Sequence, residues 1–282
     1  MVRAIVCGIL ISLCAAVMGV SLVLKRYSMI GDGLSHVGFG ALAVATAFHW
    51  APMAVSIPVV IIAAFFLLRL NENTRIKGDA AIALISTGAL AIGILVVSLT
   101  TGVNIDIYNY MFGSILAIDK ENLWLSVILC VVVIVLFVLF YNQIFAVTFD
   151  ENFAKATQMR SGIYNLLIAL LTAVIIVLGM RLMGALLISA LIIFPALSSM
   201  RVFKNYKKVT ICAAILAVVC FVIGIFLSYI IATPVGATVV VINIIVFIIF
   251  MFLFYISSAM STVCLIAIKN IVAIWTYGNA SF

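Results

Sequence analysis

Asp32 and His36 are the residues whose types and spacing best suit metal chemistry. They lie four positions apart in the glycine-containing segment 29–40. Residues four apart project from one face of a helix, so this carboxylate and this imidazole can point the same way. One oxygen ligand and one nitrogen ligand suit a borderline divalent cation such as zinc or manganese. On chemistry alone, a structural pair fits the pattern equally well, with Asp32 capping the helix and His36 hydrogen-bonded to it.

Two ligands do not complete a metal site. A transit site would need further ligands from another helix, a second subunit or water. The same segment also lacks side chains at several positions, where neighbouring helices or a hydrated path can approach the backbone closely. These positions are Gly31, Gly33, Gly38 and Gly40.

The remaining polar residues favour structural roles. His49 precedes Trp50, a pairing typical of a membrane interface, and Asp79 follows Gly78 and can cap a helix. The six cysteines form no C-x-x-C pair, so they indicate neither a metal cluster nor a disulfide framework. Polar side chains within apolar segments could line a path, but such groups usually bond back to their own helix. They are Ser86, Thr87, Ser198, Ser199 and Asn243.

Hydrolytic chemistry lacks its usual motifs in this sequence. Ser35 and Ser189 suggest an intramembrane serine hydrolase, but no G-x-S-x-G motif accompanies either residue. Ser35 and His36 are adjacent, and adjacent residues point away from each other on a helix. The sequence contains no Walker A motif, so the chain does not hydrolyse ATP by itself. Energy for transport must come from an ion gradient or a partner.

Composition places these residues in a membrane. Hydrophobic residues form 68% of the 282 residues, against about 45–50% in globular chains, and charged residues form 8%, against about 25%. A soluble domain cannot cover its surface with so few charges. These values exclude a soluble enzyme, a nucleic-acid-binding protein and a disordered chain. They predict an all-α, polytopic integral membrane protein.

Apolar runs of about 20 residues, the length needed to cross a bilayer, recur along the chain. They predict about nine transmembrane helices, within a range of eight to ten. The first run could instead be a signal peptide with Arg3 at its charged start, but further apolar spans follow it, which favours a retained helix. The predicted spans are 4–24, 33–49, 53–69, 79–100, 122–142, 162–180, 183–200, 209–230 and 237–256.

Lys and Arg residues between the spans predict the orientation. With the N-terminus outside, only Arg3, Lys120 and Arg181 lie in outer segments, against twelve basic residues in inner ones. The asymmetry predicts an outer N-terminus and an inner C-terminus, and it accounts for the net charge of +7 without nucleic acid. The inner residues are Lys25, Arg26, Arg69, Arg75, Lys77, Lys155, Arg160, Arg201, Lys204, Lys207, Lys208 and Lys269.

Two connections between spans are too long to be simple turns. The outer one, 101–121, contains the apolar piece Tyr110–Ile118, which is too short to cross and predicts a re-entrant or surface element. The inner one, 143–161, is the longest polar stretch on the inside.

The inner connection predicts a short amphipathic helix. Thr148 or Asp150 can cap it, and Phe149, Phe153 and Ala156 would fall on one face. Such a helix fits docking onto a partner protein. It fits equally well an ordinary connecting helix on the membrane surface.

Five segments follow one another along about residues 3–255: Leu24-Lys-Arg-Tyr-Ser-Met-Ile-Gly-Asp-Gly-Leu-Ser-His; Asp106 through Tyr110-Met-Phe-Gly-Ser-Ile-Leu; Phe149-Asp-Glu-Asn-Phe-Ala with Ser161-Gly-Ile; Met183-Gly-Ala-Leu-Leu-Ile-Ser-Ala-Leu-Ile-Ile-Phe-Pro-Ala; and Leu227-Ser-Tyr with Thr233-Pro-Val-Gly-Ala-Thr. Together, in this order and spacing, they resemble the ABC-3 family of metal-ion permeases. These proteins are the membrane subunits of bacterial zinc and manganese importers.

The resemblance implies a type II importer fold in which residues 1–256 form a transmembrane permease domain. Two permeases, usually identical, would pair in the bacterial cell membrane, and an extracellular metal-binding protein would deliver the metal. Asp32 and His36 match the family's acid–histidine pair, proposed to coordinate the ion in transit. Each permease would dock a cytoplasmic ABC ATPase through a coupling helix at about 148–160. The residues expected at that coupling contact are Phe149, Asp150, Glu151, Phe153 and Ala154.

Smaller features of the sequence bear on which metal is transported and on what supplies the energy. Manganese-type members tend to carry a proline shortly after the histidine, whereas residues 37–40 here are Val-Gly-Phe-Gly, which favours zinc. An iron importer stays open, as does a gradient-driven metal carrier, although the lack of a second buried charged cluster counts against the carrier. The apolar tail 257–282 matches no part of the resemblance.

Overall fold

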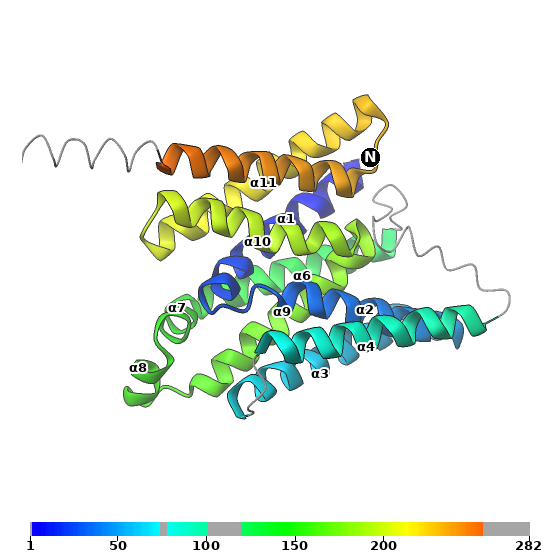
Figure 1. Cartoon of the computed structure of the whole chain (residues 1–282), viewed down its shortest axis with the longest axis horizontal. Helices are drawn as coiled ribbons and strands as arrows, with labels where there is room; N and C mark the ends of the chain where they lie inside the picture. The colour runs from blue at the N-terminus through cyan, green and yellow to red at the C-terminus, as the bar shows by residue number, and fades with distance from the viewer. Residues whose placement is uncertain (1, 74–77, 101–119, 256–282) are drawn as a thin grey trace, which may run out of the picture.

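The computed structural model describes residues 2–73, 78–100 and 120–255, and all regular structure within them is α-helical (Figure 1). The predicted all-α class is confirmed for these residues. The predictions for Tyr110–Ile118 and for the tail 257–282 lie outside the described residues. The helices are α1 (Val2–Leu24), α2 (Ile30–Ala47), α3 (Pro52–Asn73), α4 (Gly78–Leu99), α6 (Lys120–Leu139), α7 (Tyr141–Phe149), α8 (Glu151–Ala156), α9 (Ser161–Met183), α10 (Ala185–Val202), α11 (Tyr206–Ile231) and a final helix, Val235–Tyr255.

Each predicted span coincides with a described helix, yet fewer helices meet the requirements for crossing a membrane. Six of the described helices are long and apolar enough, and α6 with α7 adds a seventh if this pair, bent by 71°, counts as one span. α2 falls short because its polar residues and glycines reduce its apolar character. The part of α3 whose side chains are described, Pro52–Leu67, is too short to count as a span. The predicted number of nine is therefore not confirmed.

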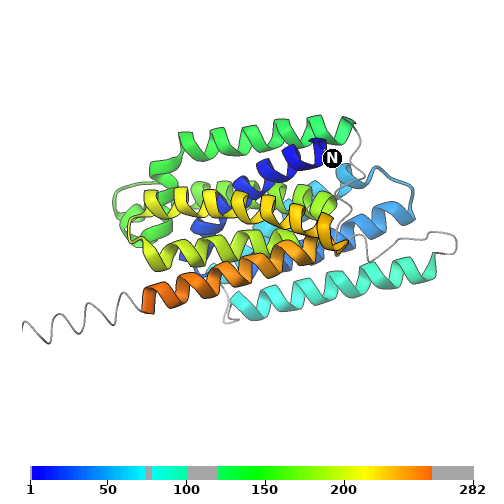
Figure 2. The same ribbon diagram turned by 90° about the horizontal axis from the view of Figure 1, so that it is seen from above.

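α9 lies at the centre of the helix bundle. It contacts α1, α3 and α10, among other helices, and every residue from Leu171 to Leu178 is buried. A helix that is apolar all round is typical of such a buried position. α2, α3 and α4 pack together on one side, while α11 and the final helix lie side by side on the other (Figures 1 and 2).

Glycines bring α2 and α4 into backbone contact. A Cβ atom at Gly93 would lie 2.9 Å from the Cα of Gly40, and one at Gly40 would lie 2.5 Å from the carbonyl oxygen of Ala89. Helices in a membrane associate through close packing, and small residues permit it. The prediction that neighbouring helices approach the glycine-containing segment closely is confirmed.

The short helices α7 and α8 stand at one end of the bundle. α6 ends at Leu139, and the chain turns by 71° into α7. Extended backbone at Asp150 then separates α7 from α8. The first turn of α1 lies at the opposite end of the bundle (Figures 1 and 2).

Candidate functional site

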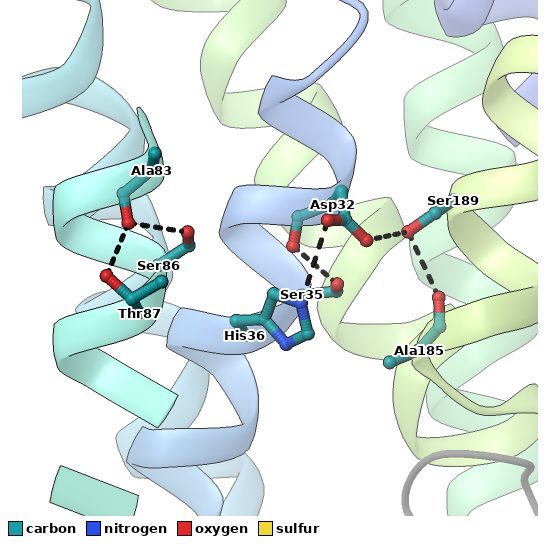
Figure 3. A network of polar contacts seen from close by, with 8 residues as sticks. All are labelled: Asp32, Ser35, His36, Ala83, Ser86, Thr87, Ala185 and Ser189. Atoms are coloured by element: carbon teal, nitrogen blue, oxygen red, sulfur yellow. Dashed lines mark hydrogen bonds and ion pairs between the residues drawn. The ribbon is translucent and has the colours of Figure 1, made fainter. Parts of the chain in front are cut away.

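Asp32 and His36 lie together on α2, as their spacing predicted. His36 Nε2 is 3.6 Å from Asp32 Oδ2, and the two side chains are drawn from one stretch of α2 in Figure 3. The Asp32 side chain is 50% exposed and that of His36 is 28% exposed, so both can reach a ligand from outside the chain. The alternative in which Asp32 caps the helix is wrong, because Met29 occupies the N-cap position and α2 begins at Ile30.

Ser189 of α10 adds a hydroxyl to this pair. Its Oγ lies 3.4 Å from Asp32 Oδ1 and 3.1 Å from the carbonyl oxygen of Ala185, so its single proton is shared between the two acceptors (Figure 3). Ser35 instead donates to the main-chain oxygen of Asp32 at 2.7 Å. Neither serine is paired with His36 in these contacts, which agrees with the absence of a hydrolase motif.

Four of the five polar residues considered in the apolar spans bond back to their own helices, as predicted: Ser86, Thr87, Ser199 and Asn243. Ser86 and Thr87 of α4 donate to the carbonyl oxygen of Ala83 at 3.0 and 2.7 Å (Figure 3). Asn243 donates to the carbonyl oxygen of Val239 at 2.9 Å. Within the described ranges, no three His, Cys, Asp or Glu residues gather into a potential metal site. Asp32 and His36 therefore offer two ligands in the part of the chain that the structure describes.

α8 is a short helix with a complete set of local interactions. Asp150 Oδ1 accepts a hydrogen bond from Phe153 N at 3.0 Å, which confirms Asp150 as the predicted cap. Glu151 and Lys155 form an ion pair at 2.8 Å. The helix is shorter than the predicted range of 148–160. α7 ends at Phe149, α8 extends from Glu151 to Ala156, and the backbone at Gln158 has a positive φ of 60° that no helix continues through.

The predicted coupling residues divide into exposed and buried ones. Phe149 and Phe153 are each 63% exposed, although large aromatic side chains are usually buried. Ala154 is fully buried against the bundle. A partner at α8 can therefore contact the two aromatic rings. Ala154 is out of a partner's reach and packs α8 against the bundle.

A polar network connects α8 to the chain segment that leads into α2. The Nζ of Lys25, which follows α1, donates to Oδ1 of the buried Asn165 on α9. Glu151 on α8 lies near Asn165 and Lys25. Burial opposes charge on Glu151, but the neighbouring Lys155, Asn165 and Lys25 outweigh it and hold the pKa of this carboxyl below its ordinary value.

Ser189 and Asn165 are residues that sequence reasoning did not connect to the site. Ser189 was considered only as a nucleophile, and Asn165 lies in an apolar run with no motif around it. Their partners Asp32 and Lys25 are more than a hundred positions away. A polar residue within an apolar span was the available signal for both.

The family model described as "ABC 3 transport family" matches residues 1–254. The chain belongs to the ABC-3 family. The resemblance predicted from the five segments is confirmed. This ABC-3 chain is a multi-pass integral membrane protein of the plasma membrane, the membrane component of an ABC transporter.

Two relatives of the ABC-3 chain carry different metals in their names. The manganese transport system membrane protein MntC of Halalkalibacterium halodurans is 27% identical, over 85% of this chain and 82% of that protein. The high-affinity zinc uptake system membrane protein ZnuB of Haemophilus influenzae is 28% identical, over 84% of this chain and 91% of that protein.

A solved structure shares the arrangement of helices described above. In PsaBC from Streptococcus pneumoniae in complex with Fab, one chain superposes with a TM-score of 0.79 at 25% identity. The match covers 88% of the ABC-3 chain and 89% of the solved chain. The fold of this permease is thus found in an experimental structure.

Proposed function

We propose that this ABC-3 chain is the permease subunit of an ATP-driven importer of a divalent metal ion, with zinc as the first candidate. The observation that carries the proposal is the Asp32–His36 pair. The two groups lie 3.6 Å apart, are partly exposed, and belong to a helix packed among membrane-spanning helices. Ionisable residues among membrane helices are costly, so a pair of them in the first turns of α2 points to a function.

Weak coordination by few protein ligands suits an ion in transit, because the ion must also leave. Asp32 supplies oxygen and His36 supplies nitrogen, and the Ser189 hydroxyl helps to orient the carboxylate. The remaining coordination positions would be filled by water or by a second, identical permease across the membrane path. An extracellular metal-binding protein would deliver the ion to the outer opening.

α8 is the proposed docking point of a cytoplasmic ABC ATPase. The exposed rings of Phe149, at the end of α7, and Phe153, on α8, offer an apolar contact, and the Glu151–Lys155 ion pair offers charge beside them. α8 packs on α9, so movement of α8 would reach the start of α2 through Asn165 of α9 and Lys25. ATP binding and hydrolysis in the partner would then alternate the opening of the path.

A gradient-driven carrier is disfavoured by the charges in the helix bundle. Among the described residues no Asp, Glu, Lys, Arg or His is buried, so the described part of the chain offers no buried charged site for a coupling ion. The choice between zinc and manganese has weaker support. Similarity does not separate zinc from manganese, since the named relatives are 28% and 27% identical, and the absence of proline at residues 37–40 favours zinc.

Cellular metal content tests this proposal. Elemental mass spectrometry under metal limitation would compare cells with the intact chain, a deletion and Asp32→Asn. We expect zinc to fall to the deletion level in Asp32→Asn, because the variant keeps the side-chain shape but loses the ligand charge. Ser86→Ala is the control, since that hydroxyl bonds only within α4 and its loss should leave metal content unchanged.

The other outcomes are informative as well. A fall in manganese would keep the mechanism and change the substrate, and iron is measured in the same samples. Normal metal content in Asp32→Asn, with unchanged amounts of the chain in the membrane, would contradict the site. No change of any metal in the deletion would contradict the proposed function.

A further inference from the structure

A groove of about 540 Å³ opens between α1, α6, α7 and α11. α2, which carries Asp32 and His36, does not line it. The wall residues are mostly apolar, so water would solvate them poorly. They are Leu13 and Val17 from α1, Ile134, Phe137 and Val138 from α6, and Ile211 and Ala214 from α11.

The polar lining residues of the groove belong to the end of the bundle that carries α8. Tyr141 and Asn142 open α7, which leads directly to α8, and Lys207 and Thr210 lie in the first turns of α11. The rings of Tyr141 and Tyr206 are 5.5 Å apart, which places the starts of α7 and α11 side by side. An apolar groove with polar groups at one membrane surface has the polarity of a phospholipid.

Charge identifies the kind of phospholipid. The exposed Lys207 has no carboxylate within ion-pair distance among the described residues. Arg201, Lys204 and Lys208 are also exposed and lie in the same eight-residue segment. Such a basic cluster next to a membrane helix attracts anionic lipids, by about 1 kcal/mol for each basic residue near the surface.

We propose that this groove binds an anionic phospholipid. Its phosphate pairs with Lys207 beside Asn142, and one acyl chain lies between α6 and α11. The apolar walls argue against free phosphate, because an inorganic ion would leave them uncovered. A phospholipid accounts for both the apolar walls and the basic end of the groove, without a second copy of the chain. The proposed metal path runs past α2, and the lipid would hold α7 against α11 independently of it.

Lipid retention by the purified chain tests the proposal. Chain equilibrated in detergent with equal amounts of phosphatidylglycerol and phosphatidylcholine, matched in acyl chains, would be examined by native mass spectrometry. We expect the wild type to retain phosphatidylglycerol about five-fold over phosphatidylcholine, the ratio that corresponds to about 1 kcal/mol. Lys207→Gln should bring this ratio close to one, whereas the neighbouring Lys208→Gln should leave it nearly unchanged, because Lys208 does not line the groove.

A second variant separates the groove from its charge. Ala214→Phe fills the groove without changing any charged residue, so it should reduce retention of both lipids. Melting temperatures check that each variant is folded. Equal retention of both lipids by the wild type, or equal loss in Lys207→Gln and Lys208→Gln, would overturn the proposal. So would unchanged retention in Ala214→Phe, or a change from dimer to monomer in that variant, which would make the groove a protein interface.

Discussion

The Asp32 carboxylate is held from two sides, by His36 on its own helix and by Ser189 on α10. The Ser189 hydroxyl shares its proton with the carbonyl oxygen of Ala185 and lies 3.4 Å from the carboxylate. It is therefore a positioning residue whose single bond is weaker than the usual 1.5–3 kcal/mol for a charged acceptor. We predict that Ser189→Ala raises the metal concentration needed for half-maximal uptake by about two- to five-fold, the range that corresponds to about 0.5–1 kcal/mol.

Uptake into cells or vesicles, measured against metal concentration, checks this prediction. The maximal rate should change less than the half-saturating concentration, because the ligands themselves remain. Ser199→Ala is a matched control on the same helix, since Ser199 Oγ bonds only to the carbonyl oxygens of Pro195 and Ala196. An equal effect of both variants would mean that α10 tolerates no loss of a hydroxyl, and Ser189 would lose its special role.

The two candidate ligands could be predicted from sequence, whereas their partners could not. Asp32 and His36 are four positions apart, and helix geometry alone brings them together. Ser189 is 157 positions from Asp32, and only the packing of α10 on α2 brings it near. The cap at Asp150 was predictable for the same reason as the pair, because it acts within three residues.

At the scale of helices, the contact between α2 and α4 depends on the absence of side chains. A Cβ at Gly93 would lie 2.9 Å from the Cα of Gly40 and 3.2 Å from the ring of Phe39, and the backbone cannot yield without moving a helix. Overpacking of this kind costs about 1–3 kcal/mol. We predict that Gly93→Ala lowers the melting temperature of the purified chain by several degrees.

α4 supplies the control for this substitution. A Cβ at Gly88 would meet no atom within 4 Å, so Gly88→Ala should leave the melting temperature unchanged or raise it slightly. Fluorescence-detected gel filtration after heating measures both variants. If the two melt alike, close packing at Gly93 does not stabilise the helix pair.

Asn165 on α9 is buried and accepts a hydrogen bond from Lys25, which lies before α2, and α8 packs on the same helix α9. We predict that Asn165→Leu lowers metal uptake several-fold while the ATPase still binds, because the hydrogen bond between α9 and the segment before α2 is lost. The lowered pKa of Glu151 means that its ionised form stabilises the fold above the ordinary pKa, and that this contribution is lost as pH falls through the lowered pKa. The loss of uptake should therefore be the same at pH 6 and pH 8.

Asn243→Leu is the matched control for Asn165→Leu. Asn243 is also buried, but its amide bonds only to the carbonyl oxygen of Val239, one turn earlier. Its replacement should leave uptake near the wild-type level. Co-purification of the ATPase and its hydrolysis rate, measured for both variants, distinguish loss of coupling from loss of the complex.

Helix positions followed from apolar runs, but bends and interruptions did not. The predicted span 122–142 ends in the structure at Leu139, where the chain turns by 71° into α7. The sequence at this point is Leu139-Phe140-Tyr141, so no proline or glycine indicates the bend. The bend is instead stabilised by packing of α7 on α1 and α9. Packing between distant segments is the information that a single sequence does not contain.

On the scale of the whole molecule, the two ends of the bundle differ in charge. The end of α1 and the start of α11 lie at the same end of the bundle as α8. The segment after α1 carries Lys25 and Arg26, Lys204 precedes α11, and Lys207 lies in its first turn. The start of α1 lies at the other end (Figure 1). This arrangement fits the predicted orientation, in which α8 faces the cytoplasm and the N-terminus faces outward. The proposed ATPase and the proposed lipid headgroup would then share one membrane surface.

The half-exposed Asp32 carboxylate, among membrane helices, needs water or further polar groups beside it. The described part of one chain gathers no third acidic, histidine or cysteine ligand around Asp32. In the proposed homodimer, the two Asp32–His36 pairs would therefore contribute to one shared path. We predict that a mixed dimer of one wild-type and one Asp32→Asn chain imports metal at well below half the wild-type rate.

Two different affinity tags on the two chains allow the mixed dimer to be isolated by sequential purification. Reconstitution with the ATPase and the binding protein in vesicles that contain a metal-sensitive dye then measures import. A shared site loses ligands for every ion when one copy changes, whereas two independent sites would keep half of the rate. A mixed dimer with Ser86→Ala should match the wild type, because that hydroxyl bonds only within α4. A rate of one half would contradict the shared site and place a complete metal path within each chain.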